Sequence, residues 1–222
     1  MLNAPSQSSG FRTIQVARGC TRCPDLVANR QCIVHGYGLN APLGGGKRVF
    51  FVGEAPGYKG GDVTGVPFTQ DRSGVRLQQA LIELGLSEES HPRVEKPRLR
   101  CFITNVVRCN PPSNRAPRRA EIERCLPYLW QEIELVRPDI VVPIGNVAAR
   151  AVFPRLLGQP AMPITRIHAR VLRGPAVLVV PMRHPARISN ADMDRFVRVM
   201  HRLLGGTPPV DTPGGGAPRR GA

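Results

Sequence analysis

The sequence predicts an α/β fold, a three-layer α/β/α sandwich in which a central, mostly parallel four-stranded sheet lies between two layers of helices. Two observations predict it. Four short apolar runs are each followed by a segment whose apolar residues have helical spacing, and strands that alternate with helices in this way form parallel sheets. In addition, the 222 residues, 41% of them hydrophobic, are enough for one large domain with an ordinary core.

The four strand-and-helix units follow one another along the chain. We expect strands at residues 47–53, 101–107, 139–144 and 177–181, followed in turn by helices at 73–85, 118–136, 146–157 and 189–204. The strands are short runs rich in Val, Ile and Phe, as is typical of a buried sheet. The helix at 118–136 has Pro117 before it and apolar residues three or four positions apart, which place Cys125 on its inward face.

The two ends of the chain differ in composition from the rest. Residues 1–10 carry Ser, Asn and Pro without periodicity, and residues 205–222 are rich in Gly and Pro; such segments bury too little apolar surface to fold. We therefore expect disordered ends and a single domain over residues 11–204. There is no apolar run of about 18 residues and no signal-peptide pattern at the N-terminus, so we expect a cytoplasmic, monomeric protein with no membrane anchor.

The chain is strongly basic. Its formal net charge is +15, and arginine carries most of the positive charge, because lysine occurs only at Lys47, Lys59 and Lys96. A folded chain with such a surplus usually has a polyanionic partner, and nucleic acid is the commonest one. We therefore expect DNA or RNA binding and, in a bacterial-type cell, association with the nucleoid.

Four cysteines have spacing typical of a metal or cluster site. Cys20 and Cys23 form a two-residue-spaced pair, and Cys109 and Cys125 bracket a Pro-rich segment and the start of a helix. In a reducing compartment such a set indicates metal ligation or plain burial rather than disulfides. Four thiolates suit either structural zinc or an iron–sulfur cluster, and Cys125 suits a core position equally well. Cys32 and Cys101 we interpret as ordinary buried cysteines.

Three loops that follow predicted strands carry polar and aromatic side chains. In a parallel sheet such loops gather beyond the carboxyl ends of the strands, where ligands bind. The loops supply Gly53, Glu54, Phe68 and Asp71 from the first strand, Asn105 from the second, and His184 with Arg187 from the last. Glycine allows a ligand to approach the backbone closely, the ring can stack on a base, and the amide can pair with a base edge.

Each of these residues also has an ordinary structural interpretation. A loop rich in Gly and Pro is usually a turn, Glu54 could be a solvated carboxylate, and Phe68 beside Pro67 could be core. Asn105 could satisfy a turn, and His184 could be a loop residue without a task. The coincidence favours function, because all three loops leave the same edge of the predicted sheet and together supply a carboxylate, an aromatic ring, an amide and an imidazole.

Four motifs stand in order between residue 20 and about residue 190. They are Cys20-x-x-Cys23; Gly53-Glu-Ala-Pro-Gly57 with Gly65-x-Pro-Phe68; Thr104-Asn-Val-Val-Arg-Cys109-Asn-Pro-Pro-Ser-Asn-Arg-Ala-Pro117 ending at Cys125; and His184-Pro-Ala. In order and spacing this set resembles the iron–sulfur uracil-DNA glycosylases, families 4 and 5 of their superfamily. No single motif would be enough for that interpretation.

The resemblance implies a monofunctional DNA glycosylase. Such an enzyme flips uracil out of DNA, because a base inside a duplex cannot be reached. It then hydrolyses the N-glycosidic bond and leaves an abasic site, which initiates base-excision repair. The implied partners are DNA that contains uracil or another deaminated base, and the downstream enzymes of base-excision repair.

By similarity, the site residues have separate roles. Gly53 would belong to the base-binding loop, Phe68 would stack on uracil, and the Asn105 amide would pair with its O4 and N3 positions. His184 would donate to uracil O2 and stabilise the departing anion, while Glu54 or Asp71 would stabilise the cationic sugar and position water. Arg187 and Ile188 would fill the space that the flipped nucleotide leaves, with phosphate binding as the alternative for Arg187.

The resemblance further implies a structural [4Fe–4S] cluster held by Cys20, Cys23, Cys109 and Cys125. Such a cluster would pin the N-terminal segment to the loop between the last two cysteines. Four arginines near this loop would then meet DNA phosphates: Arg108, Arg115, Arg118 and Arg119.

The motifs mix features of the two families. Glu54 and Asn105 match family 4, whereas the loop lengths, the segment that contains Asp71, and Arg187 match family 5. The two carboxylates therefore cannot be ranked from the sequence, and the substrate range is open, since family 5 accepts further deaminated bases. Two other interpretations compete: a non-catalytic or uracil-trapping nucleic-acid-binding protein of the same fold, and a zinc-stabilised basic α/β protein of unrelated function.

Overall fold

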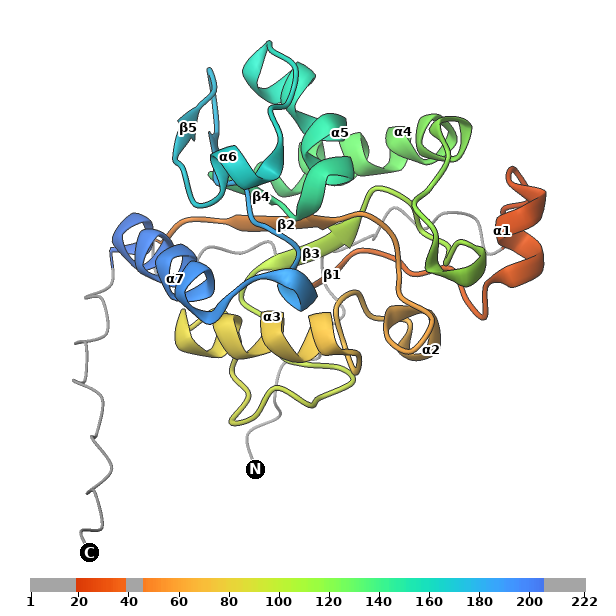
Figure 1. Ribbon diagram of the computed structural model, residues 1–222, viewed down its shortest axis with the longest axis horizontal. Coiled ribbons are helices and arrows are strands. Elements are labelled where there is room, and N and C mark those ends of the chain that lie inside the picture. Colours follow the sequence, from red (N-terminus) through yellow and green to blue (C-terminus); the bar gives the residue numbers. More distant parts are fainter. Residues whose placement is uncertain (1–18, 39–45, 206–222) are drawn as a thin grey trace, which may run out of the picture.

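A six-stranded sheet covered by helices on both faces forms the centre of the computed structural model, which describes residues 19–38 and 46–205 (Figure 1). The strands are β1 (Tyr37–Gly38), β2 (Val49–Gly53), β3 (Phe102–Asn105), β4 (Ile140–Pro143), β5 (Leu172–Arg173) and β6 (Leu178–Val179). The α-helices are α1 (Pro24–Asn29), α2 (Gly61–Thr64), α3 (Arg72–Glu83), α4 (Arg119–Val136), α5 (Gly145–Leu157), α6 (Ile164–Ile167) and α7 (Asn190–Leu204). The 3-10 turns are η1 (Pro112–Asn114) and η2 (Pro185–Arg187).

The strand order is β1-β3-β2-β4-β6-β5. The four inner strands are parallel and are the four predicted from the sequence. The prediction of four strands was nevertheless too low, because β1 pairs antiparallel with β3 at one edge and β5 pairs antiparallel with β6 at the other. Each edge strand has two residues, too few to produce a period-two pattern in the sequence.

Two hydrophobic clusters fill the two sides of the sheet. On one side, Phe51 of β2 belongs to the cluster formed with α3 and α7. On the other side, Phe50 and Val52 belong to the cluster formed with α4, α5 and α6. Successive side chains of a strand point to opposite faces, so one fully buried strand supplies both clusters. Figure 1 shows the resulting three layers, with α3 and α7 below the sheet and α4, α5 and α6 above it.

The predicted helices agree with the observed ones to within one or two residues. The short helices α1, α2 and α6 were not predicted, since each has six residues or fewer. In the described ranges no helix is both long enough and apolar enough to cross a membrane. Of the segments expected to be disordered, residues 1–10 and 206–222 lie outside the described residues, whereas Gly205 is described and caps the C-terminus of α7.

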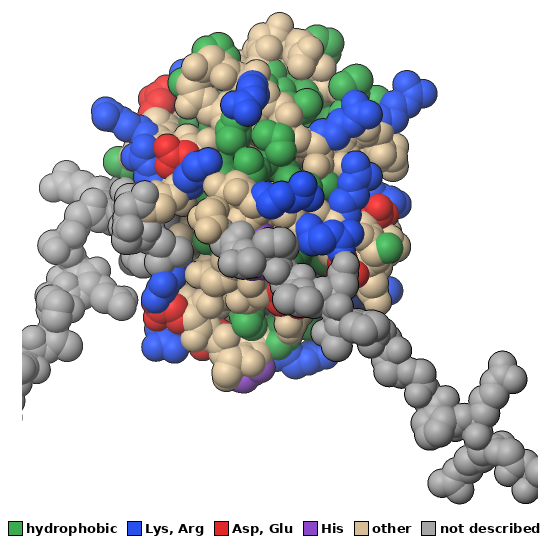
Figure 2. All heavy atoms as spheres, turned by 90° about the vertical axis from the view of Figure 1, so that its left-hand side faces the viewer, with side chains coloured by type: hydrophobic (Ala, Val, Ile, Leu, Met, Phe, Trp, Pro, Cys, Tyr) green, Lys and Arg blue, Asp and Glu red, His purple; other side chains and the backbone are tan. Residues whose placement is uncertain are grey.

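The surface reflects the basic composition. On the face shown in Figure 2, Lys and Arg side chains are spread widely and acidic side chains are fewer, as the net charge of +15 requires.

Phe51 tests the double-sided packing of the sheet. Its side chain is fully buried, and a Phe→Ala change in a core costs about 3–5 kcal/mol through lost transfer free energy and the cavity left behind. We expect Phe51→Ala to lower the unfolding free energy by that amount in urea denaturation. Val63→Ala, at a side chain that is 59% exposed, should change it by no more than about 0.5 kcal/mol. Equal effects of the two substitutions would contradict the proposed packing.

Candidate active site

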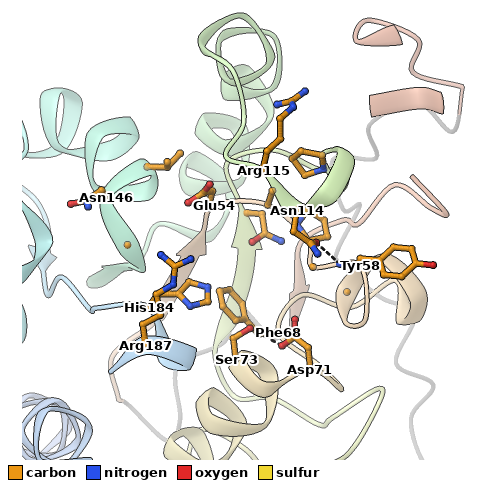
Figure 3. Close-up of a pocket in the computed structure, with 18 of the residues that line it drawn as sticks. Glu54, Tyr58, Phe68, Asp71, Ser73, Asn114, Arg115, Asn146, His184 and Arg187 are labelled. Atoms are coloured by element: carbon orange, nitrogen blue, oxygen red, sulfur yellow. Dashed lines mark hydrogen bonds between the residues drawn. The ribbon is translucent and has the colours of Figure 1, made fainter. Parts of the chain in front are cut away.

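A cavity of about 760 Å³ opens at the carboxyl ends of the parallel strands. Its lining includes five of the side chains singled out from the sequence: Glu54, Phe68, Asp71, Asn105 and His184. Figure 3 shows Glu54, Phe68 and His184 around one space, with Asp71 at the start of α3. The fold thus brings together residues that are up to 130 positions apart in the chain.

Gly53 brings the aromatic ring and the amide together. Gly53 and Asn105 are register partners at the ends of β2 and β3. A Cβ atom added to Gly53 would clash with Asn105 Oδ1 and would lie 2.5 Å from Phe68 Cε2. The missing side chain therefore allows the Phe68 ring and the Asn105 amide to meet over the strand end, although Gly53 does not itself line the cavity.

Phe68 is held in an unusual backbone conformation. Its φ is +54°, which costs a non-glycine residue about 1–3 kcal/mol unless its surroundings impose it. Gln78 of α3 donates to its carbonyl at 3.2 Å, and Gly74 lets the helix pack against the Phe68–Thr69 backbone. Thr69 is fully buried and donates to the Val66 carbonyl at 2.9 Å. The ring is thus positioned by the start of α3.

The two candidate carboxylates have different surroundings. Asp71 is the N-cap of α3, and its Oδ1 accepts from the Gly74 amide at 2.7 Å and from Ser73 Oγ at 2.6 Å. The Glu54 carboxylate has no hydrogen-bond partner among the described residues. Burial raises the pKa of Glu54, and the nearby Arg187 opposes that rise. The Glu54 carboxylate thus has no structural hydrogen bond among the described residues, whereas one oxygen of Asp71 is engaged in capping a helix.

The surroundings of His184 favour its neutral form. Burial lowers the pKa of its imidazole, Arg187 lowers it further, and Asp71 opposes both. Its Nδ1 atom is buried and has no partner among the described residues. The segment that carries it is tied to α3, because Arg76 donates to the carbonyls of Pro185 at 2.9 Å and Ile188 at 2.6 Å.

Two of the expected DNA contacts are corrected by the structure. Ile188 is 4% exposed and packs in the core with α3 and α7, so in this structure its side chain is not at the surface where it was expected. Arg108 is 1% exposed and forms an ion pair with Glu132, so it does not reach a phosphate. Arg108 follows the apolar pair Val106-Val107, and Ile188 follows a segment that begins with Pro185. Whether such residues are buried depends on the tertiary packing and is not evident from the sequence.

The other arginines remain at the surface. Arg187 is exposed and lines the cavity, near His184 and Glu54 (Figure 3). Arg115 also lines it, and its guanidinium makes a bidentate ion pair with Glu121 at 2.8 and 2.6 Å. Arg118 and Arg119 pair with Asp25 and Glu123. A phosphate would therefore compete with a carboxylate at these three residues, but not at Arg187.

The four predicted cysteine ligands line one small cavity between the start of α1, the loop after β3 and helix α4. Burial raises the pKa of Cys109 and of Cys125, and the neighbouring thiols add to the rise. Two arginines reach the sulfurs: Arg30 donates to Cys109 Sγ at 3.3 Å and Arg124 to Cys23 Sγ at 3.9 Å. Four thiols with cationic donors fit an anionic iron–sulfur group.

The geometry of these thiols does not by itself identify the bound group. Over residues 19–38 and 46–205, no three His, Cys, Asp or Glu side chains have the arrangement that a single metal ion needs. The four thiols nevertheless line the same cavity, and such a donor set suits either zinc or an iron–sulfur cluster.

Asn110, which the sequence interpretation missed, links the cysteine cavity to the active-site loop. It follows Cys109, is 1% exposed, and accepts from Asn29 Nδ2 at 2.9 Å. Its own Nδ2 donates to the Pro56 carbonyl at 2.7 Å and to Asn114 Oδ1 at 2.8 Å. Asn114 Oδ1 in turn accepts from the Tyr58 amide at 2.9 Å (Figure 3). In the sequence, the available signal was its position directly after the ligand candidate Cys109.

The fold and the site define a family. The chain belongs to the uracil DNA glycosylase superfamily, whose family model matches residues 43–204. The type-5 uracil-DNA glycosylase of Pyrobaculum aerophilum is 36% identical over 183 residues, which cover 77% of this chain and 79% of that protein. The type-4 uracil-DNA glycosylase of the same organism is 35% identical over 163 residues, 72% of each chain.

A third relative extends the match along the chain. The type-5 uracil-DNA glycosylase of Mycobacterium leprae is 32% identical over 224 aligned residues, which cover 86% of this chain and 93% of that protein. Type-4 and type-5 proteins are thus similar to this chain to nearly the same degree, in agreement with the mixed motifs in its sequence.

Asn110 provides a test of the link between the two sites. Asn110→Ala leaves the buried Pro56 carbonyl without its donor, at a cost of about 1–3 kcal/mol, and removes one of the two donors to Asn114 Oδ1. We expect faster hydrogen exchange at residues 56–60, measured by mass spectrometry, and above all at the Tyr58 amide. Gln131→Ala, at an exposed position of α4, should leave that exchange unchanged. Unaltered exchange in Asn110→Ala would show that the link does not hold the loop.

Proposed function

We propose that this protein is a monofunctional uracil-DNA glycosylase that flips uracil out of DNA, hydrolyses its N-glycosidic bond and leaves an abasic site. The observation that carries the proposal is the meeting of the Phe68 ring and the Asn105 amide over Gly53, with Glu54 and His184 on the same cavity. The names of its relatives, type-4 and type-5 uracil-DNA glycosylases, support it.

Phe68 and Asn105 recognise the base. A uracil that stacks on the Phe68 ring presents its edge to the Asn105 amide, which donates to O4 and accepts from N3–H. Cytosine has an amino group at C4 and no N3 proton, so it leaves the same amide mismatched. Gly53 makes this arrangement possible, because any side chain there would occupy the place of the amide and the ring.

Glu54 and His184 act on opposite sides of the breaking bond. As the C1′–N1 bond breaks, its electron pair goes to the base and the sugar becomes cationic. The Glu54 carboxylate stabilises the cation and orients the water whose oxygen bonds to C1′. The neutral His184 donates a hydrogen bond to uracil O2 and stabilises the anion. The water proton finally neutralises the released base.

Arg187 and the basic surface hold the DNA. Arg187 is the exposed arginine beside Glu54 and His184, and in our proposal it fills the space of the flipped nucleotide or binds an adjacent phosphate. Arg115 binds a second phosphate by exchanging its carboxylate partner. By binding DNA in this way, the protein would be associated with the nucleoid. Base-excision repair enzymes that process abasic sites would act after it.

The cysteine cavity holds the cofactor in our proposal. Cys20, Cys23, Cys109 and Cys125 would ligate a structural [4Fe–4S] cluster, which would cross-link two segments separated by 85 residues, since they end and begin at Cys23 and Cys109. Asn110, next to Cys109, would then connect the cluster region to the Pro56 loop through its hydrogen bond to the Pro56 carbonyl. The cluster itself takes no part in the bond cleavage.

An excision assay tests the activity. Purified protein is incubated with single- and double-stranded oligonucleotides that carry uracil, hypoxanthine or xanthine, and abasic product is revealed by alkaline strand cleavage. We expect cleavage at uracil. Cleavage at hypoxanthine or xanthine would show that the protein also accepts other deaminated bases, as expected for a family 5 enzyme. Binding to uracil-containing DNA without abasic product would overturn the enzyme and favour a uracil-trapping protein.

The two carboxylates can be separated by substitution. Glu54→Gln should slow single-turnover excision by about 10²-fold or more, because it removes the carboxylate that acts on sugar and water. Asp71→Asn should slow it less, since asparagine also caps a helix and keeps α3 in place. A larger loss in Asp71→Asn than in Glu54→Gln would transfer the catalytic role to Asp71.

The base edge can be tested through Asn105. Asn105→Asp removes the amide donor and should weaken uracil excision by about 1–3 kcal/mol in kcat/KM, as for the loss of a bidentate base contact. Asn146→Asp is the matched control: Asn146 lines the same cavity, and its Oδ1 accepts from the Ile164 amide, which aspartate can also do. We expect little effect there, and equal losses at the two positions would remove Asn105 from base recognition.

A further inference from the structure

Arg108 is a buried cation whose hydrogen-bonding capacity is only partly used. Its side chain is 1% exposed, and Nη2 donates to Glu132 Oε2 at 2.6 Å. Nε and Nη1 are buried and have no partner among the described residues. An unsatisfied buried donor costs about 1–3 kcal/mol, and more when the group is charged, so two such donors on one side chain indicate an absent acceptor.

The surroundings of Arg108 indicate what that acceptor is. Arg108 lines the same small cavity as the four cysteines and directly precedes Cys109 in the chain. Arg30 and Arg124, which also line this cavity, already donate to the sulfurs of Cys109 and Cys23. Of the four arginines that line this cavity, including Arg22, only Arg108 is fully buried.

We propose that the free N–H groups of Arg108 donate to the sulfur atoms of the cluster held by Cys20, Cys23, Cys109 and Cys125, and that Glu132 orients Arg108 for this contact. The inference rests on the cofactor that the proposed function includes. An iron–sulfur cluster on four thiolates is anionic, and hydrogen bonds to its sulfurs are among the factors that set its electronic properties. Glu132 compensates the guanidinium charge, so Arg108 can remain buried.

Variants of Arg108 and Glu132 can distinguish hydrogen bonding to the cluster from a purely structural role of Arg108. Replacing Arg108 alone would leave a buried carboxylate unpaired, and the protein could fail to fold. In the double variant Arg108→Gln/Glu132→Gln the two amides can still hydrogen-bond each other, but the guanidinium donors are gone. Glu132→Gln alone keeps those donors facing the cavity. Arg108→Lys keeps a cation for Glu132 without the planar fork.

The test is resonance Raman spectroscopy of the holoprotein as isolated, with iron and sulfide content measured in parallel. A hydrogen bond withdraws electron density from sulfur and weakens the Fe–S bond. We therefore expect the Fe–S stretching bands at higher frequency in Arg108→Gln/Glu132→Gln, shifted in the same direction in Arg108→Lys, and unchanged or lower in Glu132→Gln. The double variant should also lose its visible absorption several-fold faster in the presence of an iron chelator.

Three outcomes decide whether Arg108 donates to the cluster. Bands at the wild-type frequency in both the double variant and Arg108→Lys, with iron retained, would overturn the inference. If the double variant does not fold, the band shift in Arg108→Lys decides alone. Wild-type protein without iron would overturn the inference together with the cofactor assignment, whereas excision of uracil is measured separately and can stand without it.

Discussion

The parallel alignment of β2 with β3 is the constraint on which the rest of the site depends. It sets Gly53 beside Asn105 at the last residues of the two strands. Because Gly53 has no side chain, the Asn105 amide and the Phe68 ring approach each other over the strand end. A shift of this register by one residue would turn Asn105 to the other face of the sheet, and the cavity would lose its polar recognition group. The two hydrophobic clusters that pack against the two faces of β2 therefore stabilise the site as well as the fold.

Helix α3 and the cysteine region position the remaining groups from two sides. From α3, the cap at Asp71, the packing of Gly74 and the hydrogen bonds of Arg76 hold the Phe68 loop and the His184 segment. From the cysteine region, Asn110 holds the Pro56 loop next to Glu54. Glu54 itself has no such role and lies half-buried with a raised pKa. The structure thus distinguishes two carboxylates that the motifs left equivalent: one oxygen of Asp71 supports the helix, and Glu54 faces the cavity unengaged.

Fewer arginines are free to bind an anionic partner than the composition indicates. Four arginines near the cysteine loop were expected to meet phosphates, yet each is paired with a carboxylate. Arg108 is buried and paired with Glu132, so its charge does not reach the surface. Arg187 remains exposed on the cavity beside His184 and Glu54 (Figure 3). A net charge of +15 predicts an anionic partner, but only the positions of these side chains indicate where that partner is held.

The sequence by itself determined the four parallel strands, the four long helices and part of the cavity lining, namely Glu54, Phe68, Asp71, Asn105, Arg115, His184 and Arg187, because apolar periodicity and motif spacing are local properties of the chain. It also determined the superfamily, since the order of the motifs is specific in combination. The tertiary structure decided what depends on neighbours distant in sequence: the two edge strands, the burial of Ile188 and Arg108, the role of Asn110 and the different surroundings of Glu54 and Asp71. Burial and hydrogen-bond partners are set by which segments pack together, and no local pattern contains that information.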